Sequence, residues 1–204
     1  MAEECAPGNK GALLLAAGFS RRFGGVKLRA LLPDGSTVLQ QTLARLYAAT
    51  PDITLVTRSD LLADAQQAVA SLPAHARQRV QVVVCPDAHL GMGHTLAHGM
   101  RHLPAWQGVL ICLADMPAIR TETYAGMLDA LSQDDILIPV HGGRNGQPVG
   151  FGSRFFPALR GSSGDIGGRE VVRAHADRVR YMTTADPGIL QDIDTPEDLS
   201  RLHR

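Results

Sequence analysis

Five short apolar runs recur along the first two thirds of the chain, and this pattern restricts the fold more than any other feature. The runs cover residues 12–16, 53–57, 80–84, 109–113 and 136–140. The segments between them repeat apolar residues every three or four positions, which is the spacing of a helix with one buried face. Short buried strands joined by helices are typical of α/β proteins. The pattern therefore predicts an α/β fold with a mainly parallel sheet.

Beyond the fifth run the alternation weakens. A glycine-rich stretch at 150–168 predicts a less regular lobe. A last strand is expected around residues 191–193. It should be followed by a short helix to about Leu202, with Thr195 as its cap and Pro196 in its first turn. A chain of 204 residues suits a single domain.

Charge and composition exclude several partners. Twenty Lys and Arg residues balance twenty Asp and Glu residues, and aromatic residues make up only 4%, so nucleic acid is not an expected ligand. The longest apolar stretches, 12–17 and 109–114, are too short to span a membrane. The first residues do not resemble a signal peptide, and the cysteines include no C-x-x-C pair. We therefore expect a cytoplasmic protein without disulfides or zinc, in which Cys5, Cys85 and Cys112 are small apolar side chains.

The loop after the first apolar run favours phosphate binding. Ligands of parallel α/β sheets bind outside the carboxyl ends of the strands, where this loop should lie. Its small residues Ala16, Ala17 and Gly18 let backbone N–H groups approach phosphate oxygens. Arg22 can hold a phosphate through two hydrogen bonds, and Lys27 adds a movable charge. The loop matches neither the Walker A nor the dinucleotide pattern. It predicts a triphosphate site, and the alternative is a glycine-rich connection whose arginines face solvent.

Carboxylates at two places are candidate metal ligands. Asp115 ends the fourth apolar run and is soon followed by Pro117, so it should lie at the mouth of a buried strand. Mg²⁺ prefers one or two carboxylates, with water and phosphate oxygens completing its octahedron. Asp192 and Asp194 would lie on the same side of the last predicted strand, because side chains alternate with period two. Either could complete the metal site, and the other could cap or order the following turn.

Three motifs in this order resemble one enzyme family. The motif L-A-A-G-x-S-R-R-x-G-x-x-K at residues 15–27 looks like the signature of the MobA-like nucleotidyltransferases, which include the molybdenum-cofactor cytidylyl- and guanylyltransferases. The segment A-D-M-P at 114–117 is similar to the family's G-D-x-P, and D-I-D-T-P-E-D-L at 192–199 is similar to its ending. The resemblance implies a Rossmann-like three-layer α/β fold of the nucleotide-diphospho-sugar transferase type. It assigns residues 11–120 to the nucleotide and 121–204 to the acceptor.

The resemblance also implies roles for individual residues, with Mg²⁺ as the cofactor. The catalytic residues would be Arg22, Lys27 and Asp115. The nucleotide-binding residues would be Leu15, Ala16, Ala17, Gly18, Ser20, Arg22, Lys27, Pro86, Gly91 and Thr95. The acceptor-binding residues would be Gly146, Gln147, Pro148, Asp165 and Arg169. The metal ligands would be Asp115, Asp192 and Asp194.

The substrate is narrowed by the first motif. The A-A-G opening, with Ala17 at its centre, resembles the cytidylyltransferases, whereas the guanylyltransferases usually read A-G-G. This favours CTP and a molybdopterin-type acceptor, with a molybdoenzyme or its chaperone as recipient. Phe23 stands where the family usually has Met, and Gln147 stands where the cytidylyl branch has His. A guanylyltransferase, a sugar-phosphate nucleotidyltransferase and a carrier that binds nucleotide or pterin without turnover remain the alternatives.

Overall fold

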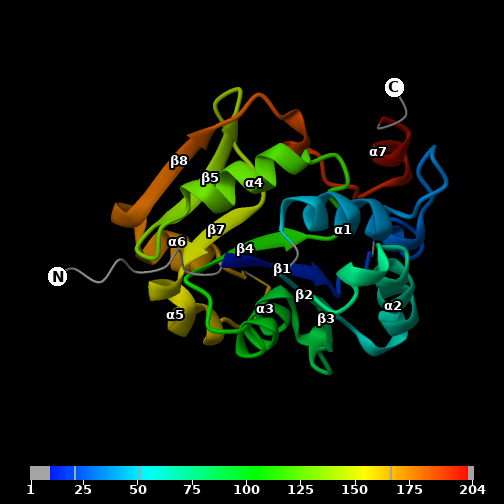
Figure 1. Cartoon of the computed structure of the whole chain (residues 1–204), viewed down its shortest axis with the longest axis horizontal. Coiled ribbons are helices and arrows are strands. Elements are labelled where there is room, and N and C mark those ends of the chain that lie inside the picture. Colours follow the sequence, from blue (N-terminus) through cyan, green and yellow to red (C-terminus); the bar gives the residue numbers. More distant parts are fainter. Residues whose placement is uncertain (1–9, 21, 51, 166, 202–204) are drawn as a thin grey trace.

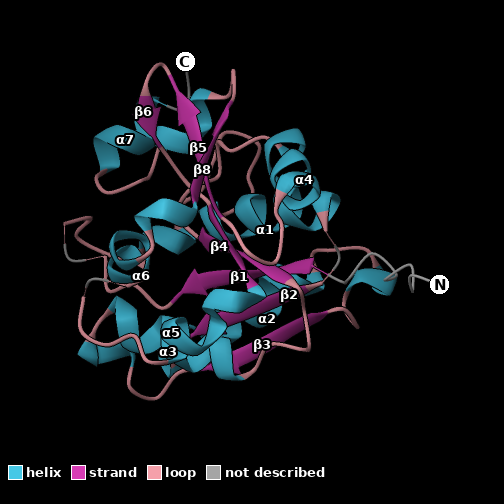
Figure 2. Cartoon of the chain, turned by 90° about the vertical axis from the view of Figure 1, so that its left-hand side faces the viewer, coloured by secondary structure: helices cyan, strands magenta, loops and turns pink. Residues whose placement is uncertain are grey.

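The computed structural model describes residues 10–20, 22–50, 52–165 and 167–201, and its centre is one mixed β-sheet. The strands lie in the order β3-β2-β1-β4-β7-β5-β6, and β8 pairs with β5. Figure 2 shows β3, β2, β1 and β4 following one another across the sheet. The five predicted strands are confirmed as β1 (Lys10–Ala16), β2 (Ile53–Thr57), β3 (Val80–Val84), β4 (Gly108–Leu113) and β5 (Ile136–His141). The further strands are β6 (Arg144–Asn145), β7 (Val149–Gly152) and β8 (Val179–Thr183).

The predicted α/β fold with a mainly parallel sheet is confirmed. Strands β1 to β4 run parallel to one another, and β8 runs parallel to β5. In contrast, β7 is antiparallel to both of its neighbours, β4 and β5. The connections from β5 to β6 and from β6 to β7 are too short for a helical crossover, so these strands can pair only in antiparallel fashion.

Helices cover the sheet on both sides. The α-helices are α1 (Val38–Ala49), α2 (Leu62–Ala70), α3 (Met92–Arg101), α4 (Thr121–Ala130), α5 (Phe156–Arg160), α6 (Arg169–Ala174) and α7 (Pro196–Arg201). Short 3-10 helices are η1 (Lys27–Arg29), η2 (Ser59–Leu61), η3 (Ala74–Ala76), η4 (Ala88–Leu90), η5 (Ser153–Phe155), η6 (Ala176–Arg178) and η7 (Pro187–Leu190). Helix α1 begins with a capping box, in which Thr37 and Gln40 satisfy each other's backbone N–H groups.

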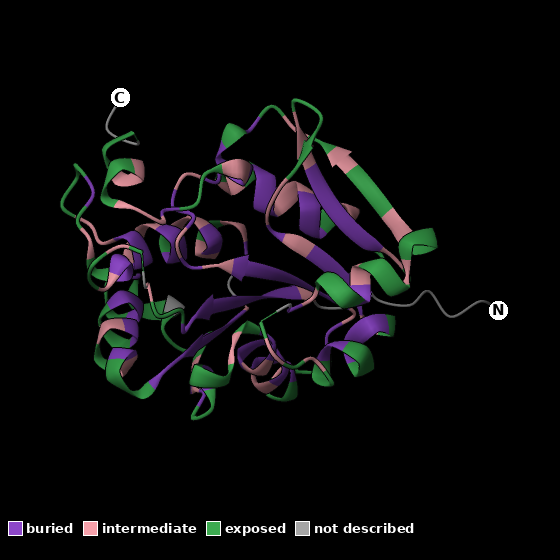
Figure 3. Ribbon diagram, turned by 180° about the vertical axis from the view of Figure 1, so that it is seen from behind, coloured by how far each residue is buried: buried purple, intermediate pink, exposed green. Residues whose placement is uncertain are grey.

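The core consists of one apolar cluster on each face of the sheet. Along β1, Leu14 packs into the cluster beneath α1, α2 and α4, whereas Leu13 and Leu15 pack into the cluster beneath α3, α5 and α6. This follows from the period-two alternation of a strand that is covered on both faces. Helices α1 and α4 lie on one side of the sheet and α3 and α5 on the other (Figure 1). The central strands are buried, while the outward helix faces are exposed (Figure 3).

The expected last strand is wrong. Residues 191–193 form no strand and follow η7 as an extended segment. The Ile193 N–H donates to the Asp115 carbonyl at 3.0 Å, and one such hydrogen bond does not make a sheet ladder. The terminal helix is present as α7, with Thr195 and Asp198 hydrogen-bonded at its start. Leu202 lies outside the described residues. Among those described, no helix has the length and apolar character that crossing a membrane requires.

Candidate functional site

A cavity of about 560 Å³ opens at the carboxyl ends of β1 and β4. All of the predicted nucleotide-binding residues except Pro86 line this cavity, which we call the loop cavity. The predicted catalytic and metal residues also line it, as do Asp165 and Arg169. The structure therefore gathers residues from five separated segments at the edge of the sheet where ligands of this fold class bind.

Four charged side chains form a network on one wall of the loop cavity. The Lys27 ammonium lies 2.5 Å from Oδ2 of Asp115 and 3.0 Å from Oδ1 of Asp194. The Arg22 guanidinium lies 2.7 Å from the other oxygen of Asp194. Arg22 is mostly exposed, whereas Lys27 is buried. Asp192 also faces the loop cavity and is exposed. The network pairs two cations with two anions at the point where phosphates and a metal are expected.

Backbone hydrogen bonds bring the aspartates to this place. The Ala114 N–H donates to the Leu15 carbonyl at 3.1 Å, which holds the ends of β4 and β1 together. The bond from Ile193 to the Asp115 carbonyl then fixes the segment that carries Asp194. The buried Thr42 hydroxyl of α1 lies 3.0 Å from the Ala114 carbonyl. Leu15, Asp115 and Asp194, which are far apart in the sequence, therefore line the same cavity.

Burial and pairing act on the charges of this network. Burial of Lys27 opposes its charged form, but the attraction and hydrogen bonds of Asp115 and Asp194 raise its pKa above the usual value. Burial raises the pKa of Asp115, although the Lys27 charge pulls it down. Oδ1 of Asp115 is buried and has no hydrogen-bond partner among the residues that the structure describes. A buried carboxylate oxygen without a partner is costly, and a cation would satisfy it.

The loop that follows β1 is shaped by local contacts. Ser20 adopts a φ of 50°, in the left-handed region, and its carbonyl accepts from the Phe23 N–H at 3.0 Å. Its hydroxyl accepts weakly, at 3.4 Å, from the N–H of Lys27. Phe23 and Val26 pack against the core cluster beneath α1, so the aromatic replacement of the family's Met serves the same apolar purpose. This turn presents Arg22 and Lys27 to the same carboxylate.

The predicted acceptor residues fall into two groups. Asp165 and Arg169 line the loop cavity, whereas Gly146, Gln147 and Pro148 do not. The latter segment is held against η7, since the Gln147 N–H donates to the Ile189 carbonyl at 2.9 Å. No contact with a substrate tests either group, and their role stays a prediction.

The start of α3 is joined to the lobe that carries Asp165. The Gly93 N–H donates to the Gly164 carbonyl at 2.7 Å. His94 accepts a hydrogen bond from the Gly164 N–H at 3.2 Å. This arrangement gives His94 a role in holding the two segments together. The nucleotide segment and the acceptor segment therefore form one continuous rim.

Sequence reasoning missed two kinds of residue. Phe19, Leu90 and Met92 line the loop cavity although each is nearly half exposed, at 46–48% of its surface. The sequence feature that could have indicated these three residues is an apolar side chain within an otherwise polar or glycine-rich loop. Arg58, directly after β2, is buried and hydrogen-bonds to the Gly18 carbonyl. The sequence could have indicated Arg58 by its position, because it directly follows an apolar run and should lie at the same edge of the sheet as the loop after β1.

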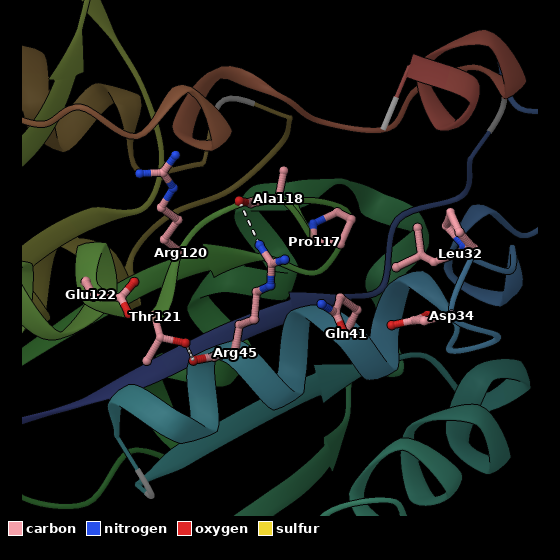
Figure 4. Close-up of a pocket in the computed structure, with 10 residues that line it drawn as sticks. Leu32, Asp34, Gln41, Arg45, Pro117, Ala118, Arg120, Thr121 and Glu122 are labelled. Atoms are coloured by element: carbon pink, nitrogen blue, oxygen red, sulfur yellow. Dashed lines mark hydrogen bonds between the residues drawn. The ribbon is translucent and has the colours of Figure 1, made fainter. Parts of the chain in front are cut away.

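A second cavity, of about 640 Å³, lies between α1 and the turn that follows Asp115 (Figure 4). The Arg45 side chain points into it and donates to the Ala118 carbonyl at 2.9 Å (Figure 4). It also donates to the Ile119 carbonyl at 3.3 Å. The Thr121 hydroxyl returns a hydrogen bond to the Arg45 carbonyl. These bonds fix the turn after Asp115 on α1, so they help to hold the metal-ligand candidate in place.

The described residues contain no group of three or more His, Cys, Asp or Glu side chains arranged to hold a metal. Asp115 and Asp194 are joined through Lys27 and are accompanied by Asp192. The pair of carboxylates Asp115 and Asp194 fits Mg²⁺ or Mn²⁺, for which substrate phosphates and water supply the remaining ligands. It does not suit zinc, which takes nitrogen and sulfur ligands in a closed shell.

Comparisons with known proteins agree with this geometry. The purine catabolism protein PucB of Bacillus subtilis is 31% identical over 198 residues, which cover 94% of this chain and 95% of that protein. The crystal structure of Rv0371c from Mycobacterium tuberculosis superposes with a TM-score of 0.77 at 25% identity, covering 97% of this chain and 98% of that chain. A complex of Rv0371c with manganese has a TM-score of 0.73 at 26% identity, covering 95% and 97%.

The molybdopterin-guanine dinucleotide biosynthesis protein A of Archaeoglobus fulgidus shares the fold, with a TM-score of 0.61 at 18% identity over 95% of this chain and 96% of that chain. The family described as the MobA-like NTP transferase domain matches residues 12–179. The match includes the loop after β1 and Asp115, and it extends over most of the sheet. This chain therefore belongs to the MobA-like NTP transferases and is a nucleotidyltransferase.

Proposed function

We propose that the chain is a CTP:molybdopterin cytidylyltransferase that depends on Mg²⁺ and releases pyrophosphate. The observation that carries this proposal is the Lys27 ammonium held between Asp115 and Asp194 on the wall of the loop cavity. A cation that could bind phosphate and two potential metal ligands lie within one hydrogen-bonded group, which supports the proposal. A nucleotidyl transfer needs both, since its transition state spreads negative charge over phosphate oxygens.

The reaction forms one bond and breaks one. An oxygen of the acceptor phosphate attacks the α-phosphorus of the triphosphate, and the bond from that phosphorus to the bridging oxygen of the β-phosphate breaks as pyrophosphate leaves. Arg22 and the loop amides bind the pyrophosphate, and Lys27 neutralises the α-phosphate as charge develops. The acceptor phosphate is ionised at neutral pH, so the reaction needs no dedicated general base.

Asp115 and Asp194 would hold the divalent metal, with Asp192 as a further carboxylate beside them. The buried Oδ1 of Asp115, to which no described residue donates a hydrogen bond, supports this assignment. A bound Mg²⁺ would neutralise charge across the phosphates and orient them for displacement. The manganese complex of Rv0371c supports a divalent metal in a relative. When a triphosphate arrives, Lys27 and Arg22 can exchange their carboxylate partners for phosphate oxygens.

The choice of CTP and molybdopterin rests on the first motif and on the relatives. Ala17 gives this chain the A-A-G opening that resembles the cytidylyltransferases. The molybdopterin-guanine protein of Archaeoglobus fulgidus has the same fold, which supports a pterin acceptor but leaves the base open. We assign residues 11–120 to the nucleotide and residues 121–204 to the acceptor, with a molybdoenzyme or its chaperone as recipient.

The test is pyrophosphate release from CTP, GTP, ATP and UTP with molybdopterin as acceptor, with and without Mg²⁺. We expect turnover with CTP that EDTA abolishes and Mg²⁺ restores. Lys27→Ala and Asp115→Asn should each lower kcat by roughly 100-fold or more, because each removes charge stabilisation from the transition state.

The chain offers a matched control for each variant. Lys10 lies at the opposite end of β1 and donates to the Leu128 carbonyl, so Lys10→Ala should leave kcat within about twofold of the wild type. Asp134 is half exposed and pairs with an exposed arginine, so Asp134→Asn should behave in the same way.

The alternatives predict different results. Turnover with GTP or with a sugar phosphate would retain the mechanism and overturn the cytidylyl assignment. Binding of nucleotide and pterin without pyrophosphate release would indicate the carrier. Full activity of Lys27→Ala would contradict the proposed role of the charged network.

A further inference from the structure

Arg58 is a buried cation that the proposed reaction does not use. It follows β2, and its side chain is only 9% exposed. Its Nη1 donates to the Gly18 carbonyl, and its Nε donates to Asp60 at 2.7 Å. Its guanidinium carbon also lies 4.4 Å from the centre of the Phe19 ring, within cation–π range. Burying a guanidinium is costly unless it is paired, so these contacts hold Arg58 in one position.

Two of the contacts of Arg58 are with consecutive residues of the phosphate loop, Gly18 and Phe19. Both residues line the loop cavity, whereas Arg58 does not. The guanidinium therefore contacts the loop without lining the cavity. This position suits a residue that acts on the loop rather than on the substrate.

The ion pairs that Arg22 and Lys27 form differ from the contacts of Arg58, because a bound substrate would compete for them. Arg22 and Lys27 bind Asp194, and Lys27 also binds Asp115. A triphosphate with its metal would compete for all of these groups, because phosphate attracts the cations and the metal attracts the carboxylates. The Gly18 carbonyl and the Phe19 ring carry no positive charge that would attract phosphate, and the carbonyl already accepts a hydrogen bond from Arg58. The contacts of Arg58 can therefore persist while the network across the loop cavity is exchanged.

We propose that Arg58 is a positioning residue that fixes the first half of the phosphate loop and so prepares its backbone for the triphosphate. The inference rests on the proposed function, since it assumes that the loop binds phosphate. A loop that is ordered before binding loses less conformational freedom on binding, which strengthens affinity. Arg58 should therefore affect the KM for the triphosphate more than kcat.

The variant Arg58→Met tests the proposal, because methionine keeps an unbranched apolar stem but has no charge and no donor. It should fold, since the groups left behind, Gly18, Phe19 and Asp60, are exposed and can be hydrated. Arg58→Lys keeps the positive charge and one donor nitrogen, so it should retain part of the loop contacts that Arg58→Met loses. Arg79→Ala is the control, because Arg79 is half exposed and pairs with Asp52 away from the loop cavity.

We expect Arg58→Met to raise the KM for the triphosphate about tenfold, with kcat and the KM for the acceptor within about twofold of the wild type. The KM of Arg58→Lys for the triphosphate should lie between those of the wild type and Arg58→Met, and the KM of Arg79→Ala should match that of the wild type. In hydrogen exchange without substrate, the amides of residues 18–20 should exchange faster in Arg58→Met, while those of α4 should not change.

The two readouts separate the proposals. If the wild type releases no pyrophosphate from any triphosphate, the proposed function fails, and hydrogen exchange together with triphosphate binding by calorimetry still tests Arg58. An unchanged KM, or unchanged exchange in the loop, would overturn the positioning role. A fall in kcat without a change in KM would also overturn it, because Arg58 would then act in the transition state.

Discussion

Two glycines in helices offer a comparison of the same substitution in different surroundings. Gly93 lies in the first turn of α3, and Gly126 lies in the middle of α4. An added Cβ at Gly93 would lie 2.3 Å from the Ser163 carbonyl oxygen and 2.9 Å from that of Gly164. At Gly126 an added Cβ meets nothing within 4 Å. Alanine should therefore have opposite effects at the two positions.

The magnitudes follow from two terms. Alanine in place of glycine favours a helix by about 0.5–1 kcal/mol, and this is the whole effect at Gly126. At Gly93 the contact is with backbone, which cannot rotate away, so overpacking should cost about 2–3 kcal/mol. The net change for Gly93→Ala is then a loss of roughly 1–2 kcal/mol of unfolding free energy. For a chain of this size, 1 kcal/mol corresponds to a shift in Tm of about 2–4 °C.

The assay is urea denaturation followed by circular dichroism, supported by Tm values. We expect Gly126→Ala to raise the urea midpoint and Gly93→Ala to lower it, with similar m-values. The contact is between α3 and the lobe that carries Asp165, so Gly93→Ala should also weaken substrate binding. A Gly93→Ala variant as stable as the wild type would refute the argument, because it would mean that the two segments separate without cost.

Two further variants test the packing around the site. Thr42→Val keeps the shape of a buried side chain but removes the hydroxyl that lies beside the Ala114 carbonyl. It should lower the unfolding free energy, measured by urea titration, by about 1–2 kcal/mol. An unchanged unfolding free energy would contradict a contribution from this hydrogen bond. Cys85 and Cys112 are free and buried, and burial raises both thiol pKa values. In a Cys5→Ser variant, which removes the thiol that lies outside the described residues, a thiol reagent should react only as the protein unfolds, and rapid labelling of the native protein would refute their burial.

Most of the fold could be predicted from local sequence patterns. The five apolar runs became β1 to β5. Strands β1, β2 and β4 are buried along almost their whole length, and a strand that is buried on both faces must be largely apolar, a signal that needs no distant partner. Residues 191–193 gave a false signal, since alternation of aspartate with isoleucine resembles a strand. In the structure this segment has one backbone bond to Asp115 and no ladder.

The site could be predicted in its motifs but not in its contacts. The sequence by itself determined that Arg22, Lys27 and Asp115 belong at the carboxyl ends of strands, because each follows or ends an apolar run. Only the tertiary structure decided that Lys27 joins Asp115 to Asp194, and that Arg58 contacts Gly18 and Phe19 of the loop after β1. Hydrogen bonds between distant segments set these distances, and such bonds depend on how strands and turns pack in three dimensions rather than on any local periodicity.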